Sequence, residues 1–136
     1  MQPRARRRGP GLVTLYDTLA ALDGAPGGAT DPEAITAAAR RGEGRALECV
    51  ARFTEILAAA AGDLALTAGT RGGIYLTGGI LPALGELFDE VRFRGRFRAK
   101  GQLHGYLAAI PVWRVKTALP ALDGLASAVR NRTLPD

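Results

Sequence analysis

The chain has 136 residues, of which 47% are hydrophobic and 23% are charged, and its formal net charge is +5. This length allows one ordinary domain, and this composition excludes an intrinsically disordered chain. A single cysteine, Cys49, excludes an internal disulfide framework and favours a reducing compartment. The longest uninterrupted apolar stretch, residues 56–61, is far too short to cross a bilayer, so no membrane partner is expected.

The chain begins with an arginine-rich head, residues 1–8, that is followed by no export signal. Asp17 and Asp23 interrupt any apolar core behind the basic residues, and Gly9-Pro10-Gly11 breaks its beginning. We therefore expect a cytoplasmic protein.

Two helices are predicted before residue 43. Apolar residues recur three or four apart from Leu12 to Leu22, which predicts an amphipathic helix that ends near residues 23–24. The stretch Thr30-Asp31-Pro32-Glu33 combines a capping side chain, a proline at the first helical position and a glutamate three residues after the threonine. It predicts the start of a short alanine-rich helix that ends at about residues 41–42.

The longest predicted helix runs from about Glu43 to about Thr67. Its apolar stripe is so broad that the helix is expected to be buried on much of its circumference. Gly62 is expected to mark a kink or a close contact, and Gly69 to cap the helix end. The stripe consists of Leu47, Val50, Phe53, Leu57, Ala60 and Leu64, and it is widened by Cys49, Ile56 and Ala61.

Two short strands are predicted, at about residues 73–77 and 111–115. The first stops at Gly78-Gly79, and a helix with Leu84, Leu87, Phe88 and Val91 on its apolar side is predicted to begin at Pro82. A further helix is predicted at residues 102–109, and a last helix begins near residue 119. Strands joined through helices are expected to lie parallel.

The first of these strands is apolar without alternation, which is typical of a strand buried on both faces of a larger parallel sheet. Two strands cannot form such a sheet, so the sequence predicts part of a domain. Glycines at the carboxyl end of a strand leave bare backbone where open α/β folds bind ligands. An isolated glycine pair is also explained by a plain strand-to-helix turn.

Other candidate chemical groups do not assemble into a site. His104 has no acidic or cysteine partner at ligand spacing, and Asp89 and Glu90 are neighbours that do not face each other on a helix. Residues 92–100 alternate basic side chains with Phe93 and Phe97, as single-strand nucleic-acid surfaces do. We favour a short helix or loop anchored by the two aromatic rings, because a stacking surface usually has more aromatic residues.

Several motifs, taken in order over about residues 9–130, resemble the carboxyl-terminal part of the bacterial glucokinases, which belong to the hexokinase–actin–Hsp70 superfamily. They are Gly9-Pro10-Gly11-Leu12-Val13, Asp63-Leu64-Ala65-Leu66, Gly72-Gly73-Ile74, Gly78-Gly79-Ile80 with Pro82, Phe93-Arg94 with Phe97, Lys100-Gly101 and Ile110-Pro111-Val112.

The resemblance implies an α/β, helix-rich, partial ribonuclease-H-like (actin-like ATPase) domain. Residues 9–115 would form part of the family's large domain, residues 116–136 would hold a terminal helix that packs on its small domain, and head 1–8 does not match. Residues 74–82 resemble the family's adenosine motif, which assigns cofactor binding to Gly78, Gly79 and Ile80. No nucleic-acid partner is expected.

The implied reaction is the ATP-dependent phosphorylation of glucose to glucose 6-phosphate, with Mg²⁺ as a further cofactor of the intact enzyme. The family's Asp-x-Gly-Gly-Thr phosphate motif, its Asn-Asp pair and its Glu-x-x-His sugar segment do not occur in this sequence. We therefore expect this chain to be inactive alone, with the family's amino-terminal half as a possible partner, and we assign it no catalytic, substrate-binding or metal-binding residue. The alternative is a catalytically dead sugar-kinase-like binding or regulatory domain.

Overall fold

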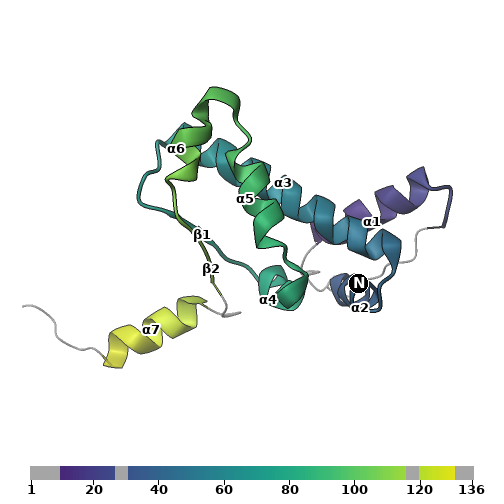
Figure 1. Ribbon diagram of the computed structural model, residues 1–136. Coiled ribbons are helices and arrows are strands. Elements are labelled where there is room, and N and C mark those ends of the chain that lie inside the picture. The colour runs from purple at the N-terminus through teal and green to yellow at the C-terminus, as the bar shows by residue number, and fades with distance from the viewer. Residues whose placement is uncertain (1–9, 27–30, 116–119, 131–136) are drawn as a thin grey trace, which may run out of the picture.

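The computed structural model describes residues 10–26, 31–115 and 120–130 (Figure 1), and the arginine-rich head 1–8 lies outside them. The order of elements confirms a helix-rich α/β class. It is α1 (Pro10–Leu22), α2 (Pro32–Arg40), α3 (Gly44–Ala68), β1 (Ile74–Leu76), α4 (Ile80–Leu84), the 3-10 turn η1 (Gly85–Leu87), α5 (Glu90–Arg98), the 3-10 turn η2 (Gly101–Leu103), α6 (His104–Ala108), β2 (Val112–Arg114) and α7 (Pro120–Arg130).

The first two helices form where the sequence predicts them. α1 begins at Pro10, two residues before the first leucine of the apolar pattern, because proline is tolerated in the first helical turn. The cap of α2 is Asp31, whose Oδ1 accepts a hydrogen bond of 2.7 Å from the backbone N–H of Ala34. Thr30, the other predicted start signal, lies outside the described residues.

The long helix α3 is the element against which the other helices pack, since α1, α2, α5 and α6 all contact it. Figure 1 shows it running through the middle of the helical part. Its bounds confirm the predicted extent. Gly69 ends it in the left-handed conformation, with φ of +63°, which confirms the predicted cap.

The predicted burial of the apolar stripe of α3 is wrong for three of its large side chains. Leu47, Ile56 and Leu64 are 43%, 59% and 67% exposed. Most of the buried positions carry small side chains instead, and they are Ala46, Cys49, Val50, Thr54, Ala58, Gly62 and Ala65. Neighbouring helices approach closely where side chains are short. The large apolar residues of α3 lie beside this contact and not within it.

The contact between α3 and α5 is tight at Gly62. A Cβ atom on this residue would lie 2.9 Å from the carbonyl oxygen of Phe97 and 3.0 Å from Cε of Lys100. Phe93 and Phe97 of α5 are each 2% exposed, and their ring centroids lie 5.9 Å apart. Gly62 therefore marks a close contact, and burial makes both aromatic rings of the basic stretch unavailable for base stacking.

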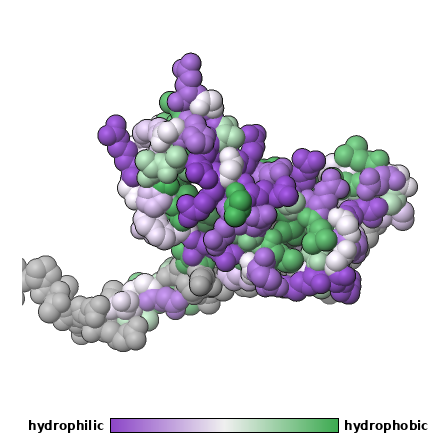
Figure 2. Space-filling view, viewed as in Figure 1, coloured by the Kyte–Doolittle hydropathy of each residue, from purple (hydrophilic) through white to green (hydrophobic). Residues whose placement is uncertain are grey.

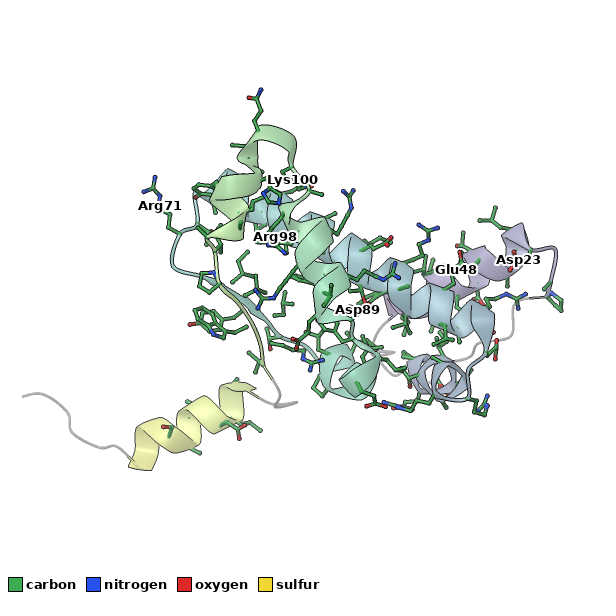
Figure 3. All side chains as sticks on the ribbon, in the orientation of Figure 1. Asp23, Glu48, Arg71, Asp89, Arg98 and Lys100 are labelled. Carbon is green, nitrogen blue, oxygen red and sulfur yellow. The ribbon has the colours of Figure 1, made fainter. Side chains whose placement is uncertain are left out.

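Acidic residues partly neutralise the basic stretch around α5, along which Figure 3 labels Asp89, Arg98 and Lys100. Arg92 donates a hydrogen bond of 2.8 Å to Glu55 of α3, and Lys100 pairs with Asp63 of the same helix. Asp89 caps α5 by accepting the backbone N–H of Arg92 at 2.9 Å. These contacts give the charges at the two ends of α5 a structural role.

β1 and β2 form a parallel pair, as predicted from the intervening helices. Ile74 is in register with Val112, Tyr75 with Trp113, and Leu76 with Arg114. The chain passes from β1 to β2 through α4, η1, α5, η2 and α6. Both strands therefore end at the same edge of the sheet.

The two faces of this sheet differ. Leu76 and Val112 point toward Phe88 and Phe93, so one face is covered. On the other face Tyr75 is 67% exposed and Trp113 is 45% exposed. Among the described residues β1 is therefore covered on one face only, as expected where a chain holds two strands of a larger sheet.

The helix predicted to begin at Pro82 has other bounds in the structure. α4 begins at Ile80 and ends at Leu84, where Gly85 adopts φ of +50°. After η1 the chain is extended at Phe88, and α5 begins as a separate helix. Val91 is consequently 82% exposed instead of lying on an apolar side of that helix.

The last helix, α7, confirms the predicted start near residue 119 and lies apart from the other helices in Figure 1. Its Leu122 and Leu125 are 58% and 63% exposed. Packing of this helix on a further domain stays a prediction.

The visible surface is mostly hydrophilic, with separate apolar patches between the charged side chains (Figure 2). Within residues 10–26, 31–115 and 120–130, every helix is too short or too polar to cross a bilayer.

The Gly62 contact predicts opposite effects for the same substitution at two helical glycines. Gly62→Ala forces a Cβ against the backbone of α5, and we expect it to lower the free energy of unfolding by about 1–3 kcal/mol. Gly95→Ala on α5 meets no heavy atom within 4 Å and removes a flexible glycine, so a gain of up to about 1 kcal/mol is expected. Thermal or urea unfolding measures both, and effects of equal sign would contradict the proposed contact.

Cys49 provides a second test of the core. Its thiol is buried, it donates to the carbonyl oxygen of Leu12 at 3.5 Å, and burial raises its pKa to about 11. At pH 8 the thiol is therefore neutral as well as inaccessible, and we expect reaction with a disulfide reagent only after unfolding. The time course of thiol release in native and urea-unfolded protein measures this, and rapid complete reaction of native protein would show that the α1–α3 contact is wrong.

Candidate functional site

The candidate site is the turn that joins β1 to α4. Gly78 and Gly79 are exposed, Ile80 is half-buried, and the three residues follow one another at the carboxyl end of β1. Gly78 adopts φ of +131°, a conformation that favours glycine, and an added Cβ would meet no heavy atom within 4 Å. The turn therefore presents bare backbone to open space at the edge where both parallel strands end.

A cavity of about 230 Å³ lies beside α4 at this end of the sheet. Its walls come from the helix itself and from the carboxyl end of β2. The volume is below the range of roughly 300–1,000 Å³ that is usual for complete small-molecule sites. The lining residues are Leu81, Pro82, Gly85, Arg114 and Val115.

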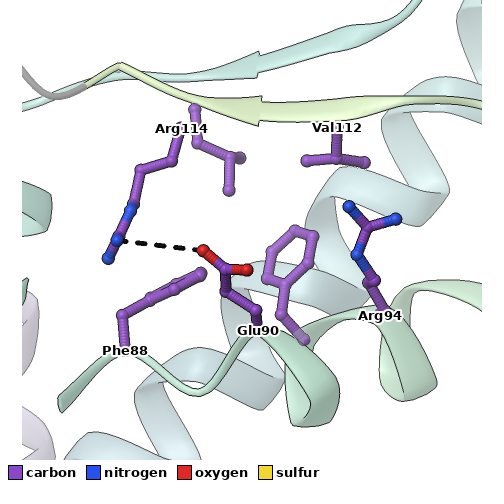
Figure 4. A pocket seen from close by; sticks show the side chains of 7 residues that line it. Phe88, Glu90, Arg94, Val112 and Arg114 are labelled. Carbon is purple, nitrogen blue, oxygen red and sulfur yellow. Dashed lines mark ion pairs between the residues drawn. The ribbon is translucent and has the colours of Figure 1, made fainter. Parts of the chain in front are cut away.

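Arg114 fixes the end of α4 from the sheet. Its Nη1 donates a hydrogen bond of 3.0 Å to the carbonyl oxygen of Gly85, and its guanidinium lies 5.1 Å from the centre of the Phe88 ring. Its Nη2 lies 3.8 Å from Glu90 (Figure 4). The arginine thus joins β2, η1 and the start of α5.

Arg40 of α2 holds the same end of α4 from the other side. Its Nη2 donates to the carbonyl oxygen of Ala83 at 2.7 Å, and its Nε lies 3.2 Å from Glu86. The pKa of Glu86 is lowered, first by hydrogen bonding to its own backbone N–H and then by Arg40. Terminal helix carbonyls need partners outside the helix, and two guanidinium groups supply them here.

Sequence reasoning missed both arginines. Arg114 occupies an ordinary strand position between apolar neighbours, and Arg40 lies at the end of a helix more than forty positions from the carbonyl that it binds. Nothing in either local pattern identifies α4 as the partner. Only the fold brings β2, α2 and α4 together.

The space under the covered sheet face is too small for a ligand. A pocket of about 50 Å³ lies between Leu76, Phe88, Phe93 and Arg94 (Figure 4). It has room for one or two water molecules.

The remaining candidate groups lie elsewhere. His104 is exposed at the start of α6, and Cys49 is buried in α3. Within the described ranges no three His, Cys, Asp or Glu side chains gather as metal ligands. His104 and Cys49 therefore lie away from the glycine turn.

Comparison with known proteins connects this site to one family. The family model described as Glucokinase matches residues 7–132. The glucokinase of Chromobacterium violaceum is 42% identical over 128 residues, which are 93% of this chain and 37% of that protein. The glucokinase of Aromatoleum aromaticum is 44% identical over 124 residues, which are 90% of this chain and 38% of that protein.

Two further matches are a bifunctional protein and a solved structure. The bifunctional protein glk of Burkholderia pseudomallei is 45% identical over 130 residues, which are 92% of this chain and 20% of that protein. A solved glucokinase from an Antarctic psychrotroph superposes with a TM-score of 0.74 at 35% identity, over 90% of this chain and 38% of its own.

The chain thus spans less than two fifths of the length of these glucokinases. The structural match confirms the predicted partial actin-like ATPase fold. Because the family model covers nearly all of the sequence, the chain belongs to the glucokinase family.

Proposed function

We propose that the chain is the carboxyl-terminal part of a cytoplasmic, ATP-dependent glucokinase, which transfers a phosphoryl group from ATP to the 6-hydroxyl of glucose. In this proposal Gly78, Gly79 and Ile80 form the adenosine side of the ATP site. The observation that carries it is the bare backbone of Gly78, which opens at the carboxyl end of β1 in a chain of this family.

The chemistry of the turn fits a nucleoside. Because an added Cβ at Gly78 would meet no heavy atom within 4 Å, a flat base or a ribose can approach the main chain there. Ile80, which is half-buried, offers an apolar contact beside it, and the braces from Arg40 and Arg114 hold α4 in place behind the turn. ATP would supply the transferred phosphoryl group when bound, and this chain would hold only its adenosine end.

Phosphoryl transfer needs Mg²⁺ on the phosphates of ATP, and the family's phosphate motif does not occur in this sequence. Phosphoryl transfer also requires a group that positions the attacking hydroxyl and cations that neutralise the phosphates. We therefore assign Mg²⁺, glucose and the catalytic base to residues outside this chain. The chain is proposed to supply one wall of the site and to be inactive alone.

The proposed division into domains follows from the same assignment. Residues 9–115 would be part of the large domain, in which α1, α2, α5 and α6 pack against α3. Residues 116–136 would hold a terminal helix that covers its apolar side on the small domain. The exposure of Leu122 and Leu125 on α7 supports this, because apolar residues repeated three apart on a helix need a partner surface.

A chimera tests the proposed function. Residues 7–132 of this chain replace the corresponding segment of the Chromobacterium violaceum glucokinase, and a coupled assay follows formation of glucose 6-phosphate. We expect activity from the chimera and none from residues 1–136 alone. A folded chimera that binds ATP but forms no product would contradict the proposal and favour a binding or regulatory domain.

The role of the glycine turn is tested within the active chimera. Gly78→Val places a branched side chain where the nucleoside would lie, and we expect the KM for ATP to rise about tenfold or more while the KM for glucose stays unchanged. Gly42→Val is the matched control, because Gly42 also has a positive φ, +86°, and an added Cβ there would also meet no heavy atom within 4 Å. Equal effects of the two variants on the KM for ATP would assign the change to backbone strain and sink the adenosine role.

A further inference from the structure

A cavity of about 350 Å³ lies at the edge of the sheet where both strands begin. It is lined by Arg71, Tyr106, Ala109 and Ile110. Arg71 precedes β1 and Ile110 precedes β2, and the two strands are parallel, so this edge is opposite to the one at Gly78. The volume falls within the range of roughly 300–1,000 Å³ that is usual for small-molecule sites, whereas the cavity beside α4 is smaller.

The loop between α3 and β1, residues 69–73, is fastened to α6 across this cavity. The hydroxyl of Tyr106 on α6 donates a hydrogen bond of 2.6 Å to the carbonyl oxygen of Thr70 in the loop. Tyr106 is half-buried, and Ile110, which follows α6, is 5% exposed. The cavity therefore has an apolar side, built from an aromatic and an aliphatic residue that are held in place.

The same loop supplies hydrogen-bond donors without an acceptor. Arg71 is exposed, and among the described residues no carboxylate pairs with its guanidinium. Figure 3 shows its side chain extending from the loop, apart from the other labelled side chains. The N–H groups of Arg71 and Gly72 also donate to no protein group in the described part of the chain. A guanidinium beside two successive unpaired N–H groups suits an oxyanion.

We propose that this cavity binds a small organic oxyanion, namely a carboxylate or a phosphate monoester that carries a flat apolar body. The guanidinium of Arg71 and the N–H of Gly72 hold the oxyanion, and Tyr106 and Ile110 contact the apolar body. Both parts are needed, because an exposed arginine pair adds little affinity on its own. The site is separate from the adenosine turn, and the inference does not depend on the proposed function.

Nuclear magnetic resonance of the full chain, labelled with a nitrogen isotope, tests the site without nucleotide or glucose. Phenyl phosphate and benzoate each combine an oxyanion with a flat ring, inorganic phosphate lacks the ring, and benzyl alcohol lacks the charge. We expect saturable shifts of the amides of Arg71, Gly72 and Tyr106 with the two ring-bearing anions, and binding about tenfold weaker or less for the other two probes. The tighter of the two anions identifies the headgroup, and the amides of Gly78 and Gly79 should not move.

Two variants and one control separate the site from the general positive charge of the chain. Arg71→Gln removes the guanidinium, and Ala109→Glu places a negative charge at an exposed position of the cavity, so we expect each to weaken the binding of phenyl phosphate about tenfold or more. Arg41→Gln is the matched control, because Arg41 is also exposed and no carboxylate among the described residues pairs with it. It follows α2, which lies at the other end of the helical part from α6 in Figure 1.

Four results would overturn the inference. They are no saturable shift with either ring-bearing anion, equal binding of phenyl phosphate and inorganic phosphate, equal weakening by Arg71→Gln and Arg41→Gln, and shifts confined to residues 78–80. Circular dichroism checks the fold of each variant. The probes are measured without turnover, so an inactive chimera would overturn only the proposed function, and a cavity that binds no probe would overturn only this inference.

Discussion

The close approach of α5 to α3 at Gly62 is the contact on which the rest of the structure depends. α3 holds α1 near its amino-terminal end, where Cys49 meets the carbonyl of Leu12, and it holds α5 near its carboxyl-terminal end. α5 in turn carries Phe93, which lies under Leu76 of β1. The sheet is therefore connected to the helical core through α5, and any side chain at residue 62 pushes on that connection. The stability of the sheet therefore depends on how α5 packs against α3.

The candidate nucleotide turn is supported in the same indirect way. Gly78 and Gly79 have no large side chains of their own to pack, and α4 is only one turn long. Its carboxyl end is instead held by Arg40 and Arg114, which bind the carbonyl oxygens of Ala83 and Gly85. Each arginine is also paired with a carboxylate, so its guanidinium is oriented when it meets the carbonyl. A flexible stretch rich in glycine thus becomes a defined surface through contacts made by α2 and β2.

The sequence predicts elements well and predicts burial less well. The bounds of α1, α2 and α3, the parallel strands and the cap at Gly69 follow from proline, glycine and local periodicity, which act over a few residues. The helix predicted to begin at Pro82 is an exception, because α4 ends at Leu84 and α5 begins separately. The stripe of α3 fails because Leu47, Ile56 and Leu64 dominate any count of apolar residues, whereas contact with α5 requires a position without a side chain. The arginine braces could not be predicted, since each depends on elements that only the fold brings together. The placement of Gly78, Gly79 and Ile80 at the end of a strand was predictable, because a glycine pair after an apolar run is a local signal.

The glycine turn and the bare aromatic face belong to the same strand. β1 ends one residue before the turn begins, and Tyr75 lies at its centre. Because only Thr77 separates β1 from Gly78, the main chain of the strand leads directly into the turn. The conformation of the turn at Gly78 therefore depends on how firmly the strand before it is held. Two strands with a single covered face do not hold their connecting turn as firmly as a full sheet does.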